Sequence, residues 1–339
     1  MKHDKHHRAA HKPTKGFSLV ELMVGMVLGV IVIGGAISVY LASKRSLTEV
    51  EQVATLSENG RFALQLLGYS IRHIGFYGGP NPDDYNCDPS DSCIPLEPPA
   101  GDCTGEAAAY DIENSFFALR ATSATVAGCI TDAMPDTDVL VIKGVEPRPL
   151  YHEDPRNPSV SDGGVISFPA GEWSDQKTYV IANSVVGALR DGADTPDGVS
   201  DGDVAWPYRF QIYYIRDGAM PTLSRKILAW DAGTESMSIQ TEDLVQGVEN
   251  MRFRFGYDSD NDGQVDTLTY LDGITAWEQV ASLQIFILLT SDVTDPNYTS
   301  EKTYQLGDIP ITEGDSTRRL LLQSDITLRN PSLILRGEG

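Results

Sequence analysis

The residues best suited to chemistry stand in one short acidic segment, D-S-D-N-D-G-Q-V-D, at positions 258–266. Side chains with oxygen atoms occupy alternate positions in it: Asp258, Asp260, Asp262, Gln264 and Asp266. On a tight loop such side chains turn toward one centre, Gly263 permits the sharp turn, and the next backbone carbonyl adds an oxygen. Hard oxygen ligands suit calcium, so the segment predicts a Ca²⁺ site.

A different interpretation of this segment is an Asp/Gly hairpin turn without a ligand. A complete EF-hand loop places a bidentate glutamate six residues after its glycine, and this chain has Thr269 there. The segment also lies between two predicted strands rather than two helices. Both interpretations stay open at this point. A second acidic stretch, 191–203, is expected to be a solvated loop.

Residues that would support enzymatic catalysis are scarce. Residues 198–202 match G-x-S-x-G, but a nucleophile elbow at Ser200 needs a buried strand before it and a helix after it, and both flanks are rich in Asp and Gly. Beyond the first sixteen residues, the histidines are His73 and His152, and neither has the spacing of a triad or metal site. There is no P-loop and no dinucleotide fingerprint. We expect that the chain is not an enzyme.

The composition is that of an acidic protein with enough apolar residues for a sizeable core. Of 339 residues, 48 are acidic, 26 are basic and 41% are hydrophobic, and the formal net charge is −22. This charge argues against nucleic acid as a partner, because sequence-independent binding requires clustered Lys and Arg. The first sixteen residues are the exception, with five Lys and Arg against one Asp. Such a basic end stays on the cytoplasmic side of a membrane.

A long apolar segment comes after the basic end. Residues 17–42 contain one charge, Glu21, and as a helix they would extend about 39 Å, enough to span a bilayer. The alternative is a secretory signal peptide, whose apolar part is about 7–15 residues long and ends in a cleavage site. This segment is longer and continues into more helix. A carboxylate inside an apolar helix is costly, so Glu21 needs a partner.

Helical periodicity continues through residues 43–75. Apolar residues recur at spacings of three and four from Leu47 to Ile74, with charged residues between them. We therefore expect one helix from 17 to about 74, ended by Gly75 and by the glycines and proline at 78–80. Its amphipathic second half should lie on a sheet.

All the cysteines fall in the next segment, 76–135, which is rich in Pro, Asp and Gly and is expected to have little regular structure. They are Cys87, Cys93, Cys103 and Cys129. An even number beside a membrane segment predicts disulfides in an oxidising compartment, with three pairings open. The alternative is a zinc site, which the absence of a C-x2-C pair disfavours.

Residues 136–339 read as a β-rich head. Apolar runs between turn residues predict strands at 139–144, 165–168, 179–182, 210–216, 251–257, 265–270, 280–289 and 318–329. One long helix followed by many strands gives the α+β class.

Residues 15–21, K-G-F-S-L-V-E, with the apolar segment behind them, resemble the class III signal of type IV prepilins and type II secretion pseudopilins. The resemblance implies that residues 1–16 are a leader, that a prepilin peptidase cuts between Gly16 and Phe17, and that the new amine of Phe17 is methylated. It also implies that Glu21 pairs with the N-terminal amine of a neighbouring subunit, which would supply the partner that this charge requires.

Further segments resemble the PilW family of minor pilins. They are E-N-G-R-F-A-L at 58–64, I-R at 71–72, G-F-Y-G at 75–78, T-D-V-L-V at 137–141, Y-Y-I-R at 213–216, L-V-Q-G-V-E at 244–249 and the stretch 318–330. The resemblance implies a type IV pilin fold, in which the long helix packs on an antiparallel β-sheet head. It also implies a low-abundance pilin that primes the filament at its tip and supports twitching motility and adhesion. Other minor and major pilins and a tip adhesin would be its partners.

The same resemblance implies a single-span precursor in the inner membrane, with a cytoplasmic N-terminus and a periplasmic head, which later joins the pilus at the cell surface. Two alternatives stay open. A J-type pseudopilin of a type II secretion system shares this architecture. A binding module displayed on the pilus would instead use the calcium loop or the disulfide loop to touch a surface.

Overall fold

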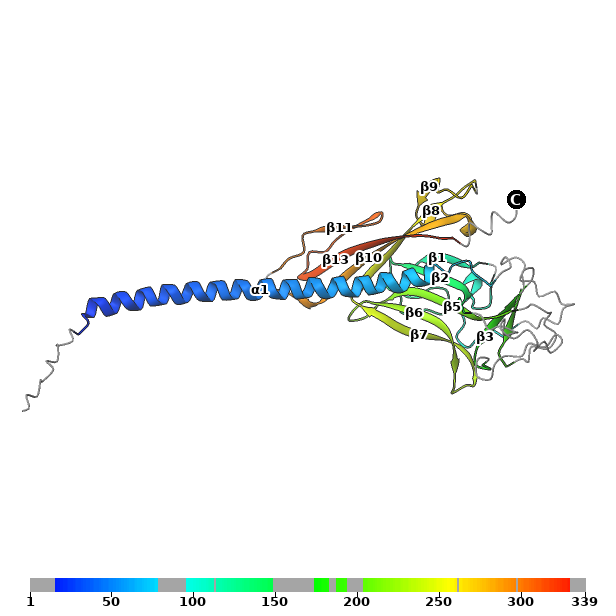
Figure 1. Ribbon diagram of the computed structural model, residues 1–339, viewed down its shortest axis with the longest axis horizontal. Helices are drawn as coiled ribbons and strands as arrows, with labels where there is room; N and C mark the ends of the chain where they lie inside the picture. The colour runs from blue at the N-terminus through cyan, green and yellow to red at the C-terminus, as the bar shows by residue number, and fades with distance from the viewer. Residues whose placement is uncertain are drawn as a thin grey trace, which may run out of the picture. The chain divides into compact units, whose positions relative to one another are not determined.

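The computed structural model describes residues 16–78, 96–112, 114–148, 174–182, 187–193, 204–260, 262–296 and 298–329 (Figure 1). The chain divides into two compact units, Met1–Gln52 and Val53–Gly339, and we describe each by itself. Its helices are α1 (Leu19–Ile71) and the short 3-10 turns η2 (Gly105–Ala107), η3 (Leu271–Gly273) and η4 (Trp277–Gln279). Its strands are β1 (Phe116–Arg120), β2 (Asp138–Val145), β3 (Thr178–Ala182), β4 (Gly187–Asp191), β5 (Val204–Arg216), β6 (Thr222–Asp231), β7 (Ser236–Gln246), β8 (Val248–Tyr257), β9 (Thr267–Thr269), β10 (Val280–Thr294), β11 (Thr303–Leu306), β12 (Ile309–Thr312) and β13 (Thr317–Thr327).

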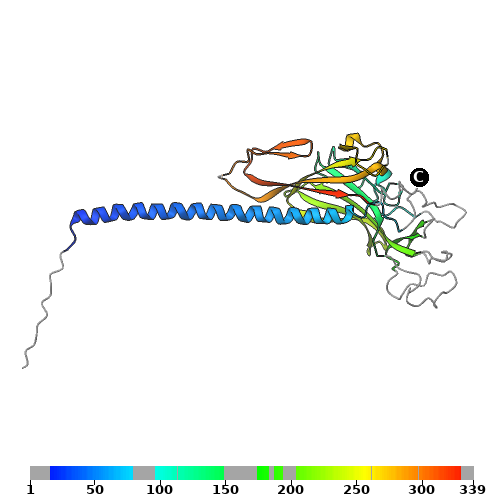
Figure 2. The ribbon, with the colours of Figure 1, turned by 45° about the horizontal axis from the view of Figure 1, so that its top comes forward.

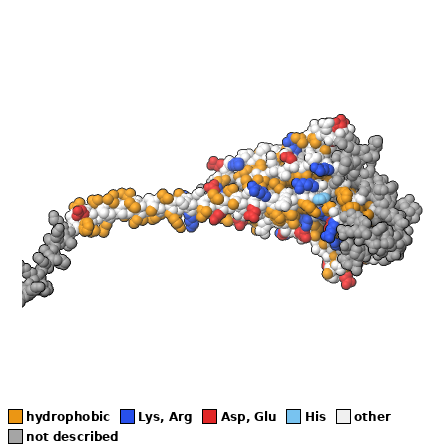
Figure 3. All heavy atoms as spheres, viewed as in Figure 1, with side chains coloured by type: hydrophobic (Ala, Val, Ile, Leu, Met, Phe, Trp, Pro, Cys, Tyr) orange, Lys and Arg blue, Asp and Glu red, His pale blue; other side chains and the backbone are white. Residues whose placement is uncertain are grey.

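The first unit is the N-terminal part of α1. Its apolar side chains lie on the helix surface all along this part, as Figure 3 shows. By length and composition, α1 is one helix able to cross a membrane, and none of its most apolar window is buried. A signal sequence would pass the same test, but the apolar part of a signal peptide is only about 7–15 residues long. The continuous helix to Ile71 is much longer than such a segment.

The helix is slightly shorter than the sequence predicts. It begins at Leu19 rather than at residue 17 and ends at Ile71 rather than near residue 74. Single hydrogen-bonded turns continue the chain to Phe76, and Gly75 adopts a φ of 75°, which stops the helix from continuing.

Within the described residues, the larger sheet of the second unit has seven strands, all in antiparallel pairs, with β5 at its centre. β2 pairs with one edge of β5, from Tyr208 to Tyr213. On the other edge, β3 pairs with the first residues of β5 and β6 with the last ones. β1, β4 and β7 then extend the sheet beyond β2, β3 and β6.

A second, four-stranded sheet has the order β13-β10-β8-β9, and β11 and β12 form a separate hairpin. Side chains of β10 alternate between two environments. Ile285 and Ile287 face the main core, while Phe286 and Leu288 face Tyr304 of the hairpin. The hairpin therefore covers the outer face of this sheet, as the turned view shows (Figure 2).

The main core lies where α1 and the two sheets meet. The helix contributes Leu56, Ala63, Leu67 and Ile71, at the spacing of one helix face. Strands of both sheets supply the rest, among them β2, β5, β8 and β10. The prediction that the second half of the helix lies on a sheet is confirmed.

A second core covers the other face of the seven-stranded sheet. In β2, Leu140 belongs to the main core, whereas its neighbours Val139 and Val141 belong to this second one. Residues of the segment 96–135 complete it, among them Ala107, Ala109, Val126 and Ile130. That segment also contains β1, which the sequence did not predict, but β1 and η2 are its only strand and helix among the described residues, so it has little regular structure, as expected.

Most of the predicted strands are present. Those at 139–144, 179–182, 210–216, 251–257, 280–289 and 318–329 correspond to β2, β3, β5, β8, β10 and β13, and 265–270 shortens to β9. The predicted strand at 165–168 lies outside the described residues. Sequence reasoning missed β1, β4, β6, β7, β11 and β12, which are short or are held by strand pairing instead of by a continuous apolar run.

A buried carboxylate joins the two sheets. Asp138 of β2 accepts hydrogen bonds from the Phe253 amide of β8 at 2.8 Å and from Arg252 at 3.1 Å. Arg120 of β1 lies 2.7 Å from the same carboxylate. Arg252 also makes a two-pronged contact, 2.7 Å at each nitrogen, with Asp308 in the turn between β11 and β12. The network therefore ties both sheets and the hairpin together.

Close approach of α1 to the four-stranded sheet depends on Gly60. A Cβ atom there would lie 2.5 Å from Leu322 of β13 and 2.7 Å from Leu289 of β10. Gly68, two turns further on, is different, because a Cβ would meet Ile326 at an ordinary 3.5 Å.

We predict opposite effects of alanine at these two helix glycines. Gly68→Ala should raise the free energy of unfolding by up to ~1 kcal/mol through helix propensity. Gly60→Ala should lower it by ~1–2 kcal/mol, because the new methyl group displaces two core leucines. Chemical unfolding of the full chain in detergent, followed by tryptophan fluorescence, measures the difference. Equal changes in the free energy of unfolding for Gly60→Ala and Gly68→Ala would show that the packing of α1 does not depend on the close approach at Gly60.

Candidate functional site

The predicted processing site precedes α1. Gly16 and Phe17 lie ahead of the first helical residue, and both are exposed. Among the residues from 16 onward that the structure describes, no atom beyond the adjacent residues would lie within 4 Å of a Cβ on Gly16, and Phe17 is 90% exposed. The Gly16–Phe17 peptide bond is therefore open to a peptidase. The cleavage itself stays a prediction.

Glu21 has a partner within its own chain. Its carboxylate accepts the Ser18 amide hydrogen at 2.9 Å, and the Ser18 hydroxyl accepts the Glu21 amide hydrogen at 3.1 Å. This reciprocal pair is a capping box, which satisfies two free donors at the helix start. Sequence reasoning missed it, although S-x-x-E at 18–21 is its signature. The carboxylate keeps acceptor capacity for a second donor, so pairing with a neighbour's amine stays a prediction.

The acidic loop joins β8 to β9, two paired antiparallel strands. One carboxylate oxygen from each of Asp258, Asp260 and Asp262 lies within 4.8 Å of the other two. Asp258 is 3% exposed and accepts the amide hydrogens of Asp262, at 3.2 Å, and Gly263, at 2.7 Å. The structure therefore brings three of the five predicted ligands together around a tight turn.

The other two predicted ligands are held differently. Asp266 accepts hydrogen bonds from the amide and the hydroxyl of Ser259, at 2.9 and 2.7 Å, and the bond from the hydroxyl is the main cause that lowers its pKa. Gln264 donates its side-chain amide to Asp262 at 3.1 Å. The hairpin is thus present, and calcium binding stays a prediction that rests on the first three carboxylates.

We predict that calcium stabilises the head through this loop. About 5 mM Ca²⁺ should raise the melting temperature of the full chain, since a ligand that binds only the folded state stabilises it by mass action. Asp260→Ala should abolish that rise. Asp292→Ala, which removes an exposed carboxylate of β10 outside the loop, is the control and should keep it. If Ca²⁺ does not raise the melting temperature of the wild type, or raises that of Asp260→Ala equally, the loop is a hairpin turn that does not bind calcium.

Of the four cysteines, Cys103 and Cys129 form a disulfide with an S–S distance of 2.03 Å. Bonded sulfurs do not ligate zinc, which removes these two from the zinc alternative. Cys87 and Cys93 lie outside the described residues. The Asp102 carboxylate accepts the amide hydrogens of Cys103 and Ala109, at 2.8 and 2.9 Å, so the bonded segment is also held by hydrogen bonds.

A buried lysine fixes the same segment to the sheet. Lys143 of β2 donates its Nζ hydrogens to the Glu106 carbonyl, at 2.5 Å, and to the Asp111 carbonyl. Burial lowers the pKa of Lys143 to about 8, and nearby carboxylates partly oppose this. Sequence reasoning missed this residue, although a lysine inside the apolar run 139–145 is a visible signal.

The residues considered for catalysis give no constellation among those described. His73 lies just after α1, and its Nδ1 is 2.7 Å from the Tyr69 carbonyl, in agreement with a helix-end role. Ser200 and His152 lie outside the described residues.

Comparison with known families gives two matches. Residues 212–330 match the family described as type IV pilus-assembly protein W, PilW, and residues 11–37 match the prokaryotic N-terminal methylation motif. The first spans β6 to β13 and the C-terminal end of β5, from Ile212 to Arg216, and the second includes Gly16, Phe17 and Glu21. The first match is to a family of pilus assembly, which is a structural and not an enzymatic role.

Comparison with curated proteins gives no match. Among solved structures, the chain is similar to the type IV-like pilin TTHA1219 from Thermus thermophilus, with 12% identity and a TM-score of 0.35. That match covers 81% of this chain and 97% of the other. The family assignment rests on the two family matches alone.

Proposed function

Since the chain is a prepilin-like protein of the PilW family of type IV pilus assembly, we propose that it is a minor pilin that primes the filament at its tip. The observation that carries the proposal is the presence of a methylation motif at 11–37 and a PilW segment at 212–330 in one chain. In this role it would support twitching motility and adhesion.

The precursor is proposed to enter the inner membrane through residues 17–42, with its basic leader in the cytoplasm and its head in the periplasm. The exposed apolar surface of this part of α1 supports the proposal, because such a surface is stable only in lipid or against other apolar helices. A prepilin peptidase would cut at the open Gly16–Phe17 bond and methylate the amine of Phe17. The shortened chain would then exchange lipid contacts for contacts with other minor and major pilins.

Glu21 is proposed to guide that exchange. Its carboxylate would accept the amine of a neighbouring subunit while it keeps the Ser18 amide in the capping box. An isolated carboxylate in lipid is unfavourable. The pair would therefore favour the alignment of neighbouring helices in which the Glu21 carboxylate lies beside the amine of the next subunit. This role differs from capping in one respect: it needs a negative charge, whereas capping needs only an acceptor oxygen.

The PilW match supports a pilus over a type II secretion pseudopilin, although both would use the same helix. A calcium-dependent binding module is a second candidate, favoured by the three carboxylates within 4.8 Å of one another. A tip adhesin bound to the head is an additional proposed partner.

We predict that two substitutions at the capping box separate its two roles. Glu21→Gln keeps an acceptor for the Ser18 amide but loses the charge, so its level in sheared filaments should fall at least ~10-fold, equivalent to ~1.4 kcal/mol. Ser18→Ala loses part of the cap but keeps the charge, so it should be incorporated at close to the normal level. Immunoblots of filaments and membranes from the native host measure both variants.

A primer acts below stoichiometric amounts, so the Glu21→Gln strain should also display fewer surface pili than the Ser18→Ala strain. Both variants should be processed normally, which serves as the control for insertion. Normal incorporation of Glu21→Gln would exclude the pairing role. An unchanged number of surface pili in a strain that lacks this protein would exclude priming.

A further inference from the structure

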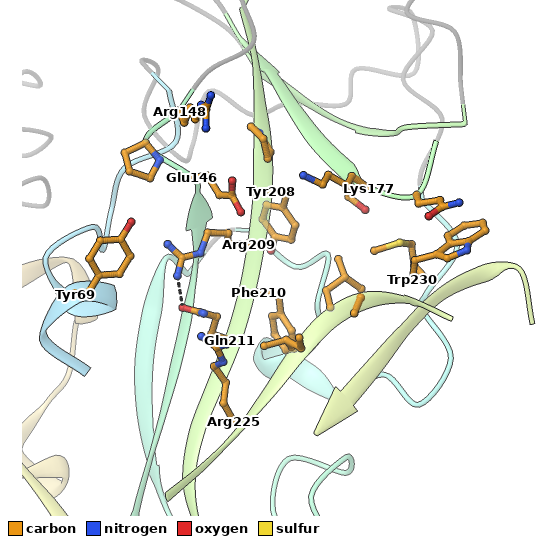
Figure 4. Close-up of a pocket in the computed structure, with 18 residues that line it drawn as sticks. Tyr69, Glu146, Arg148, Lys177, Tyr208, Arg209, Phe210, Gln211, Arg225 and Trp230 are labelled. Carbon is orange, nitrogen blue, oxygen red and sulfur yellow. Dashed lines mark hydrogen bonds between the residues drawn. The ribbon is translucent and has the colours of Figure 1, made fainter. Parts of the chain in front are cut away.

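The head contains a pocket of about 670 Å³ that none of the features above uses. It lies between the end of α1 and strands β3, β5 and β6, with residues of the β2–β3 connection at its rim (Figure 4). This volume lies within the range of small-molecule sites, which is about 300–1,000 Å³.

The lining is basic, although the chain carries a net charge of −22. Arg148, Lys177 and Arg209 line the pocket with one acidic residue, Glu146. Arg225 also lines it, but its guanidinium group is paired with Glu242. Among the residues that the structure describes, no carboxylate lies within salt-bridge distance of the first three cations.

Most other arginines of the two sheets have carboxylate partners: Arg120, Arg216, Arg225, Arg252, Arg318 and Arg319. Arg254 of β8 is an exception within the described residues, and its guanidinium group lies over the Tyr270 ring instead, 5.8 Å from the ring centre. In a protein with nearly twice as many acidic as basic residues, cations without partners in a concave site indicate affinity for an anion from outside.

Arg209 is held in place for such a contact. Its guanidinium group lies 5.7 Å from the centre of the Tyr69 ring and donates one hydrogen bond, at 2.9 Å, to the buried Gln211 side chain. A guanidinium group has five N–H donors, so most of them are free for a ligand. In Figure 4 the Arg209 and Arg148 side chains lie on the same side of β5 as Tyr69.

The opposite part of the pocket is apolar. Trp230 and Met237, from the paired strands β6 and β7, line it together with Ile227 and Leu228. Trp230 lies on the far side of β5 from Arg209 in the close-up (Figure 4). The pocket therefore offers Arg148 and Arg209 on one side of β5, and an apolar wall with Lys177 beside it on the other.

We propose that this pocket binds a carboxylate joined to an apolar body, either a free organic acid or the C-terminal residue of a peptide. The planar guanidinium fork of Arg209 matches a planar carboxylate, with Arg148 adding charge from the same side of β5. Glu146 in the same lining disfavours a second negative charge, which selects a monoanion over a phosphate dianion. The apolar body lies against Trp230 and Met237.

Titration of the full chain in an uncharged detergent tests the proposal, with N-acetyl-phenylalanine as the probe and a micelle-only blank. The probe should bind saturably below ~10 mM and change Trp230 fluorescence. N-acetyl-phenylalanine amide, which lacks the carboxylate, should bind at least ~10-fold more weakly. Arg209→Gln should weaken the acid ~10-fold, and the control Lys226→Gln, on β6 but outside the lining, should not.

Unfolding midpoints of both variants equal to the wild type would show that the heads are intact. A tetrapeptide that ends in phenylalanine with a free carboxylate distinguishes the two sources. Tighter binding of the peptide identifies a chain end, and equal or weaker binding identifies a small acid. No saturable binding, equal binding of acid and amide, or tighter binding of inorganic phosphate would each overturn the proposal. None of these outcomes bears on membrane insertion or filament assembly.

Discussion

The burial of Asp138 between two sheets is the contact on which the rest of the head depends. Its carboxylate is fully buried, and so is nearly all of the Arg252 side chain that it meets. Burial raises the pKa of Asp138 to about 8, the nearby Asp308 and Asp272 carboxylates add to this rise, and the hydrogen bond from the Phe253 amide partly opposes it. A buried charge without such partners would cost several kcal/mol. The partners of Asp138 come from β1 and β8, and Arg252 is also bonded to Asp308 in the β11–β12 turn, so the network has one satisfied arrangement, which sets how the sheets meet.

The position of the sheets then determines the surface that receives α1. Leu289 and Leu322 stand where Gly60 lets the helix approach, and Leu67 and Ile71 fill the core beyond. Further along the helix, the Ser70 hydroxyl and the Tyr213 hydroxyl share a buried hydrogen bond of 2.8 Å. From Val53 onward the helix is thus part of the head. In the described part of the first unit, from residue 16 on, the apolar side chains of α1 are exposed, which suits a segment whose partners are lipid and other helices.

Periodicity predicted those elements in which one pattern persists over many residues. The helix and the long apolar strands β2, β5, β8 and β10 belong to this group. β6 and β7 were missed because their residues are partly exposed and polar, and pairing with a neighbour holds them in the sheet. The second core was missed for a related reason. Ala107, Ala109 and Ile130 are scattered through a segment rich in turns, so no local pattern marks them as buried.

The functional residues also fall into a group that the sequence predicted and a group that it did not. Gly16, Phe17 and Glu21 were identified because their meaning lies in a short linear motif, and the alternation of Asp258, Asp260 and Asp262 predicted their convergence. The basic pocket could not be predicted, since Tyr69, Arg148, Lys177 and Arg209 come from four separate segments. Only the fold brings them together. The sequence gives only a weak indication of this pocket, because isolated basic residues in an acidic chain usually have carboxylate partners.

The central claim is that the chain is a prepilin whose leader is removed before its helix enters a filament. The most direct test is the intact mass and N-terminal sequence of the protein extracted from the membranes of its native host. The account predicts a chain that begins at Phe17 and is heavier by one methyl group. A chain that still begins at Met1, or one cut after the apolar segment, would contradict it, because the helix would then be a plain anchor or a secretory signal.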